Sequence, residues 1–198
     1  MIDIGGESTR PWGYTKISDE EETDRVVPVI EAVKKEFEIP ISVDTYKSGV
    51  AEAAAQAGAD LINDIWGLKY DARMAEVIAK SGLACCLMHN RDNTEYRNFM
   101  EDMKQDLRET IALAKAAGIA DDKIILDPGV GFAKSYENNL EVIRRLKEFN
   151  ELKYPVLLGT SRKSVIGLTL DLPAAERVEG TIVNGHGGGS RLYVCPCA

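Results

Sequence analysis

Short apolar runs alternate with longer stretches of helical spacing along most of the chain. The runs are rich in β-branched residues and often end in a polar residue, which is typical of buried parallel strands. Six strands are predicted: one that begins at residue 1, and five at residues 39–44, 59–63, 83–89, 124–127 and 154–158.

Helical patterns occupy the segments between these strands. A capping box, Ser18-Asp-Glu-Glu21, precedes apolar residues at helical spacing, and Pro28 either kinks this helix or marks its start. Thr45 is the candidate cap of a second helix, which Gly58 ends. Further helices are predicted at about residues 71–80, 98–117 and 135–149.

This alternation predicts βα units around a parallel sheet. Four predicted strands end in Asp44, Asn63, His89 and Asp127. A doubly wound sheet is compatible with this order, but polar residues at so many strand ends favour a (β/α)8 TIM barrel. Because such barrels have about 250 residues, the chain of 198 residues predicts an incomplete barrel, with about six of eight strands recognisable.

Both ends of the chain depart from this pattern. A strand that begins at the first residue suggests a missing upstream piece. After residue 183 the sequence is rich in Gly and Cys and predicts neither a final helix nor a final strand, which a frameshift would explain. We therefore divide the chain into a partial barrel domain, residues 1–183, and a divergent tail, residues 184–198.

Composition restricts the class of protein. With 44% hydrophobic and 28% charged residues, the chain reads as one soluble globular domain. The net charge of -8 argues against a nucleic-acid partner, and no apolar run is long enough to span a membrane. Neither a leader peptide nor a spacing of the four cysteines typical of zinc or a secreted disulfide framework is found, so a cytoplasmic protein is expected.

The polar strand ends carry the candidate chemistry. Asp44 and Asp127 offer carboxylate acceptors, and the amide of Asn63 both donates and accepts. Such a set suits a flat heterocycle with adjacent N–H donors and a carbonyl acceptor. Any one of these residues is better explained as a simple strand end, but three at corresponding positions, with Lys163 after a fourth strand, favour a binding site.

Other segments are ambiguous when taken alone. Residues 159–164, Gly-Thr-Ser-Arg-Lys-Ser, are equally compatible with an anion cradle and with a solvated basic turn. The loop at residues 5–11 carries Arg10, which could meet a substrate, although an ordinary βα loop is the better reading. His89 is expected to be a structural or lining residue and not a catalytic base. The esterase-like segment 186–189 has no accompanying Gly-x-Ser-x-Gly motif, so that reading is rejected.

Five motifs in register resemble the dihydropteroate synthases over about residues 2–183. They are Gly5-Gly-Glu-Ser-Thr-Arg-Pro11, Val43-Asp-Thr-Tyr-Lys47, Ile62-Asn-Asp-Ile65, Leu126-Asp-Pro-Gly-Val-Gly-Phe132 and Gly159-Thr-Ser-Arg-Lys-Ser164. The resemblance implies a (β/α)8 barrel of folate biosynthesis and a target of sulfonamides. It implies an enzyme that joins 4-aminobenzoate to (7,8-dihydropterin-6-yl)methyl diphosphate, releases pyrophosphate with the help of Mg²⁺, and forms homodimers.

The resemblance also implies roles for individual residues. Asp127 and Lys163 are the candidate catalytic residues. The implied pterin site consists of Asp44, Asn63, Ile65, Met88, Asp127, Gly159 and Lys163. The implied 4-aminobenzoate site consists of Thr9, Arg10, Pro11, Phe132 and Ser161. In this family the C–N bond forms after, or as, the diphosphate leaves a resonance-stabilised cation, so the site must orient the leaving group and exclude water.

Two family features have no counterpart in the chain. A first strand with a metal-binding Asn is absent, so no metal ligand is expected here. The Arg-Val-His segment that grips the diphosphate is replaced by the tail, so the chain is expected to be a poorly active or inactive fragment. The alternatives are the pterin-binding domain of a methyltetrahydrofolate:corrinoid methyltransferase and a non-catalytic pterin-binding remnant. The loops at residues 8–11 and 161–164 favour the synthase.

Overall fold

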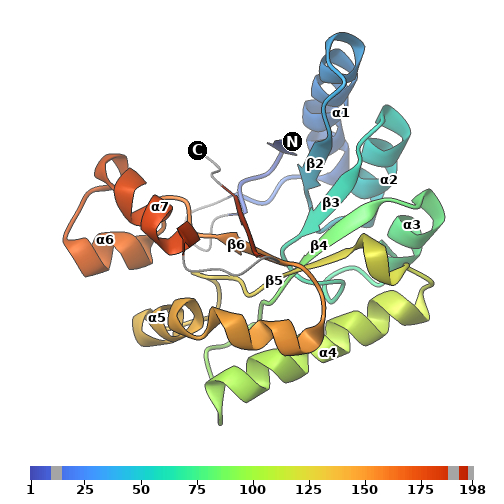
Figure 1. Ribbon diagram of the computed structural model, residues 1–198. Helices are drawn as coiled ribbons and strands as arrows, with labels where there is room; N and C mark the ends of the chain where they lie inside the picture. Colours follow the sequence, from blue (N-terminus) through green and yellow to red (C-terminus); the bar gives the residue numbers. More distant parts are fainter. Residues whose placement is uncertain (10–14, 187–191, 196–198) are drawn as a thin grey trace. The chain divides into compact units, whose positions relative to one another are not determined.

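The computed structural model of the chain describes residues 1–9, 15–186 and 192–195 (Figure 1). It divides into two compact units. The first unit comprises Met1–Met88 and Glu109–Ile124, and the second comprises His89–Arg108 and Ile125–Ala198.

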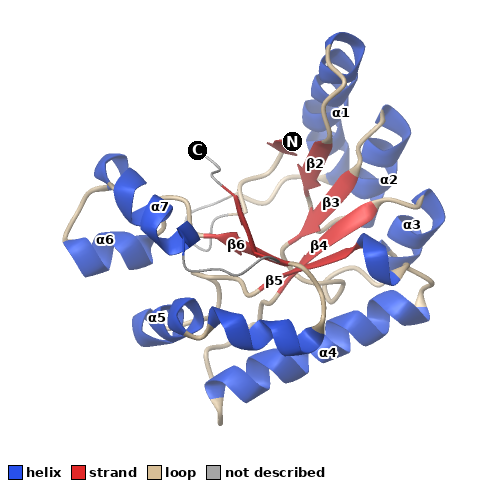
Figure 2. Cartoon of the chain, in the orientation of Figure 1, coloured by secondary structure: helices blue, strands red, loops and turns tan. Residues whose placement is uncertain are grey.

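The first unit is built from four parallel strands and the helices that connect them. Each strand pairs with the next one along the chain. The strands are β1 (Ile2–Gly5), β2 (Ile41–Asp44), β3 (Leu61–Asp64) and β4 (Ala84–Met88). The helices are α1 (Asp19–Glu36), α2 (Ser48–Ala57) and α3 (Met74–Ser81), followed later in the chain by the 3-10 helix η1 (Asp121–Lys123). Figure 2 shows α1, α2 and α3 side by side along these strands, with α1 against α2 and α2 against α3.

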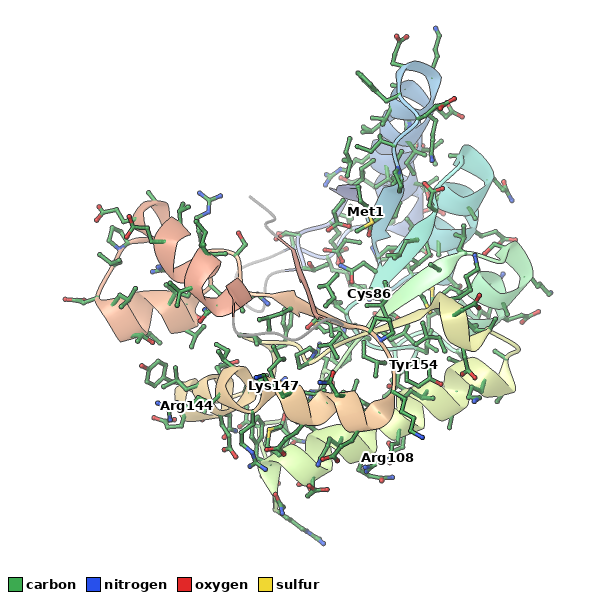
Figure 3. All side chains as sticks on the ribbon, in the orientation of Figure 1. Met1, Cys86, Arg108, Arg144, Lys147 and Tyr154 are labelled. Atoms are coloured by element: carbon green, nitrogen blue, oxygen red, sulfur yellow. The ribbon has the colours of Figure 1, made fainter. Side chains whose placement is uncertain are left out.

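The strand register separates two faces of the first unit's sheet. Ile62 is the direct partner of Val43 on one side and of Cys85 on the other, so these three buried side chains share one face. Asn63 is likewise the partner of Asp44 and of Cys86 on the opposite face. Burial raises the pKa of the Cys85 thiol to about 12, and Cys86, labelled in Figure 3, is also buried.

The second unit contains three parallel strands, in which β6 pairs with both β5 and β7. The strands are β5 (Ile124–Asp127), β6 (Val156–Gly159) and β7 (Leu192–Cys195). The helices are α5 (Tyr136–Arg144), α6 (Ser164–Leu170) and α7 (Val178–His186), with the 3-10 helices η2 (Leu146–Leu152) and η3 (Ala174–Glu176). The long helix α4 (Phe99–Ala116) has residues in both units. Among the described residues, no helix is long and apolar enough to cross a membrane.

Local sequence signals account for most of these elements. The six predicted strands are present with slightly shifted bounds. Ser18 caps α1 by accepting a hydrogen bond from the Glu21 backbone N–H, and Ser135 caps α5 in the same way. Gly58 ends α2 in the left-handed conformation, with φ 102°. Pro28 lies inside α1, so its alternative role as the helix start is wrong.

Three predictions are corrected. Thr45 does not cap α2, which begins at Ser48, because the first N–H of the helix donates to Asp71 Oδ2 at 2.9 Å. The helix predicted to reach residue 149 stops at Arg144 and continues as η2. After residue 183, α7 extends to His186 and a seventh strand, β7, follows. The hydrogen bonds of β7 with β6 are tertiary, so a local pattern did not reveal the strand. The division of domain and tail at residue 183 stays a prediction.

Candidate functional site

Two polar strand ends of the first unit lie directly beside each other. Asp44 on β2 is the register partner of Asn63 on β3, so both side chains project from the same face of adjacent parallel strands. Thr9 Oγ1, from the loop after β1, donates a hydrogen bond to Asp44 Oδ2 at 2.9 Å. An acceptor, an amide and a hydroxyl are therefore gathered at one edge of this sheet.

The carboxylate of Asp44 has one oxygen atom available to accept a hydrogen bond from a ligand. Among the described residues, its buried Oδ1 atom has no hydrogen-bond partner. Burial raises the pKa of Asp44 to about 7; the Thr9 hydrogen bond opposes this effect, and the negative charges of Asp3, Glu22 and Asp64 add to it. A ligand N–H at Oδ1 would satisfy the buried acceptor and favour its charged form.

A buried ion-pair cluster anchors the loop that carries Thr9. Lys47 Nζ lies 2.8 Å from Glu7 Oε2 and 2.6 Å from Glu22 Oε2, and it also donates to the Ile17 carbonyl at 2.9 Å. Glu7 Oε2 in turn accepts from the Ile17 backbone N–H at 2.8 Å. Glu7 precedes Thr9 and Ile17 follows it, so the cluster holds both ends of the loop.

The remaining predicted residues of the first unit are apolar or fall outside its described part. Ile65 and Met88 are buried. Met88 lies two residues after Cys86, the partner of Asn63, so it belongs to the same face as Asn63. Arg10 and Pro11 lie outside the described residues, so their predicted roles remain expectations.

The second unit places Asp127 at the end of β5, where it is buried. Its Oδ1 atom accepts a hydrogen bond from the Gly129 backbone N–H at 2.7 Å. Burial raises the pKa of Asp127, although the nearby ammonium groups of Lys163 and Lys134 act in the opposite direction. The group is therefore a carboxylate in a low-dielectric setting with cations close by.

Lys163 reaches back over the loop that follows β5. Its Nζ atom donates to the Val130 carbonyl and lies 4.8 Å from the centroid of the Phe132 ring. A Cβ atom at Gly131, where φ is 90°, would lie 3.4 Å from Lys163 Cδ. A Cβ atom at Gly159 would lie 3.4 Å from Asp127 Oδ2 and 3.9 Å from Lys163 Nζ. Both glycines therefore lie within van der Waals distance of Lys163, and Gly159 also lies beside the Asp127 carboxylate.

The predicted anion cradle is a turn whose backbone already has protein partners. Ser161 is half-buried in the turn. The Arg162 N–H donates to Thr181 Oγ1 at 3.0 Å, and the Arg162 carbonyl accepts from Arg177 at 3.1 Å. These bonds connect the turn to α7 and to the residue after η3. Anion binding here stays a prediction.

Sequence reasoning missed a polar cluster beside Asp127. The His89 backbone N–H donates to the Asp127 carbonyl at 2.8 Å, and the buried His89 ring contacts Lys134 and Asp106. Burial lowers the pKa of His89 to about 4, which agrees with a structural role. Lys134 and Asp106 lie 45 and 17 residues from His89. No local spacing could have revealed the cluster.

The described residues do not form a metal cage. Within residues 1–9, 15–186 and 192–195, no group of three or more His, Cys, Asp or Glu side chains could hold a metal ion. Mg²⁺ is usually held by one or two carboxylates together with the phosphate oxygens of a substrate, so its binding here stays a prediction.

The sequence matches a known family over nearly its whole length. The family described as pterin binding enzyme matches residues 1–187. The chain is 63% identical to the dihydropteroate synthase of Clostridium beijerinckii over 182 residues, which are 92% of this chain and 67% of that protein. It is 55% identical to the dihydropteroate synthase of Bacillus subtilis over 181 residues, 91% of this chain and 63% of that protein. The chain thus spans about two thirds of the length of these relatives.

Solved structures resemble the chain closely. Dihydropteroate synthase from Clostridium difficile, crystallised in the presence of pteroic acid, has a TM-score of 0.94 and 48% identity, and the match covers 98% of this chain and 76% of that one. The Xanthomonas albilineans dihydropteroate synthase with 4-aminobenzoic acid has a TM-score of 0.91 and 37% identity, over 98% and 73% of the two chains. This likeness confirms the predicted fold class, a (β/α)8 barrel of which the chain forms a part.

Proposed function

The chain belongs to the pterin-binding enzymes, and among them to the dihydropteroate synthases; from this premise we propose that it condenses 4-aminobenzoate with (7,8-dihydropterin-6-yl)methyl diphosphate. The products are 7,8-dihydropteroate and pyrophosphate. The observation that carries the proposal is the buried Oδ1 atom of Asp44, an acceptor with no partner among the described residues. The relatives are named dihydropteroate synthases, which favours this reaction over that of a corrinoid methyltransferase.

The pterin is recognised through its pyrimidine edge. Asp44 and Asp127 accept N–H groups of the ring, and the amide of Asn63 both donates and accepts. Lys163 donates to the pterin carbonyl and ring nitrogen. Ile65, Met88 and Gly159 line the ring. A buried carboxylate that accepts two N–H groups rejects rings that cannot donate them.

The 4-aminobenzoate site is assigned to Phe132, Ser161 and the loop of Thr9, Arg10 and Pro11. The aminobenzoate nitrogen forms a bond to the exocyclic methylene carbon of the pterin. The C–O bond to the diphosphate breaks before or during this step, and the electron pair leaves with pyrophosphate. The amine then loses a proton to solvent. Electron density from the pterin ring stabilises the positive charge on the methylene, so the protein acts by orientation and exclusion of water.

Three further properties belong to the proposal. Mg²⁺ accompanies the diphosphate, which brings oxygen ligands of its own. The resemblance to the synthases also supports a cytoplasmic location and a homodimer.

The test is isothermal titration of the chain with 6-hydroxymethylpterin, with Asp127→Ala as the control. Saturable binding that the control abolishes is the expected result. A folded chain that binds no pterin contradicts the proposal. Binding without turnover of the two substrates would identify a non-catalytic pterin-binding protein instead.

A further inference from the structure

Lys134, a half-buried residue of the second unit, makes three hydrogen bonds. Its Nζ atom lies 2.9 Å from the Gly129 carbonyl oxygen, 2.9 Å from the Phe132 carbonyl oxygen and 3.1 Å from His89 Nδ1. An ammonium group has three N–H donors and no acceptor. All three donors are therefore used, two of them on the loop between β5 and α5.

His89 and Asp106 orient this ammonium group through hydrogen bonds. Because Lys134 donates to Nδ1, that nitrogen must accept, and the proton of the neutral ring resides on Nε2. Nε2 then donates to Asp106 Oδ2 at 2.8 Å. The same oxygen accepts from Arg91 Nε at 2.6 Å. Lys134, His89 and Asp106 are therefore connected by a continuous series of hydrogen bonds.

The chain of hydrogen bonds ends at the proposed pterin carboxylate. Gly129, whose carbonyl binds Lys134, uses its N–H for Asp127 Oδ1 at 2.7 Å. His89, the other partner of Lys134, donates its backbone N–H to the Asp127 carbonyl at 2.8 Å. Phe132, the second loop residue held by Lys134, is assigned to the aminobenzoate site. Gly129 and His89 therefore each donate a hydrogen bond to Asp127, and both are bound by Lys134. Lys134 also binds the Phe132 carbonyl in the same loop.

We propose that Lys134 is a positioning residue, which sets the Asp127 carboxylate and the Phe132 loop for the two substrates, while His89 and Asp106 orient its ammonium group. This inference rests on the proposed function and deepens it, because it names a residue outside the substrate contacts that determines pterin affinity.

The cost of burying Lys134 supports a functional reason for its presence. Burial lowers the pKa of Lys134 to about 7; Asp127 and Asp106 act against this effect, and the positive charges of Lys163 and Arg91 add to it. An ammonium group whose pKa is lowered in the folded state costs folding free energy at neutral pH. Packing alone therefore does not explain a lysine at this position.

The experiment measures the affinity for 6-hydroxymethylpterin and the thermal midpoint of four variants. Lys134→Met removes the donors but keeps most of the length of the side chain, and we expect pterin binding to weaken by about tenfold or more. The midpoint should fall, since the His89 ring and two loop carbonyls lose their donor, so the affinity is compared for protein that remains folded. Lys134→Arg, which keeps donors, should recover part of the affinity. The control Lys147→Met changes an exposed lysine of η2, labelled in Figure 3, and should leave the affinity unchanged.

Asp106→Asn, the fourth variant, keeps the proposal testable if Lys134→Met does not fold. It removes the charge that orients His89 and leaves Lys134 in place, so a smaller loss of pterin affinity is expected. A folded Lys134→Met protein with wild-type affinity overturns the inference alone, as does wild-type affinity of Asp106→Asn when Lys134→Met is unfolded. Failure of the wild-type chain to bind pterin, or binding that Asp127→Ala leaves intact, instead overturns the proposed function on which the inference rests.

Discussion

Asp44 illustrates at the scale of a single residue how a buried carboxyl group costs stability at neutral pH. Its pKa is raised from 3.8 to about 7, chiefly by burial. The folded state therefore holds the proton more tightly than the unfolded state. The resulting stabilisation is fully present below pH 4 and is lost as the pH rises through about 7.

Asp44→Asn should consequently stabilise the protein at pH 8 by roughly 1–3 kcal/mol and change little near pH 3.5. Chemical denaturation of both proteins at the two pH values measures the difference. The same substitution should abolish or strongly weaken pterin binding, because an amide cannot replace the charged acceptor. An equal gain at both pH values would show that ionisation of Asp44 is not the cause.

Lys47 stabilises the folded protein, because its ammonium group neutralises the buried carboxylates of Glu7 and Glu22. Lys47→Met should leave Glu7 and Glu22 uncompensated and lower the free energy of unfolding by about 3–5 kcal/mol at pH 7. The matched control is Lys34→Met, which removes a part-exposed pair with Asp60 and should cost about 1 kcal/mol or less. Urea denaturation measures both, and equal effects would contradict the assigned importance of burial.

At the scale of the element, the loop between β5 and α5 shows why backbone conformation matters. Gly131 and Gly118 have nearly the same positive φ, 90° and 92°. An added Cβ would lie 3.4 Å from Lys163 Cδ at Gly131, whereas at Gly118 no described atom lies within 4 Å. An alanine would therefore strain the backbone at either position, but only at Gly131 would its methyl group contact Lys163.

Gly131→Ala and Gly118→Ala should each destabilise the protein by about 1–2 kcal/mol, because alanine disfavours the left-handed region. Only Gly131→Ala should also weaken pterin binding, since its backbone strain falls next to the Val130 carbonyl that Lys163 contacts. Thermal denaturation and pterin titration of the two variants separate the effects. A loss of pterin affinity in Gly118→Ala would point to a global disturbance.

Elements with local signals could be predicted from the sequence, and elements set by tertiary contacts could not. Ser18, Ser135 and Gly58 act through neighbours a few residues away, and their helix ends are confirmed. The start of α2 depends on Asp71, which lies 23 residues after Ser48, and the prediction for Thr45 is wrong. Asp44 and Asp127 could be proposed for the pterin site because they end predicted strands, whereas Lys134 had no such marker.

At the scale of the whole molecule, ligand binding and folding are linked, because a ligand that binds only the folded state raises the free energy of unfolding. If 6-hydroxymethylpterin binds only the folded chain, a concentration of about 100 times its Kd should add about 2.7 kcal/mol to the free energy of unfolding. Urea denaturation with and without the pterin measures this gain. Asp127→Ala should show none of it, and an equal gain in that variant would mean that the pterin binds elsewhere.

The two adjacent thiols of β4, Cys85 and Cys86, can report when this strand becomes exposed to solvent. Cys85 and Cys86 are buried on opposite faces of the strand, so a thiol reagent can modify them only when the strand is exposed. In a chain with Cys195→Ser and Cys197→Ser, the labelling rate would time the opening of β4 without any attached dye. Slower labelling in the presence of pterin would then reveal how far the ligand's protection extends into the sheet.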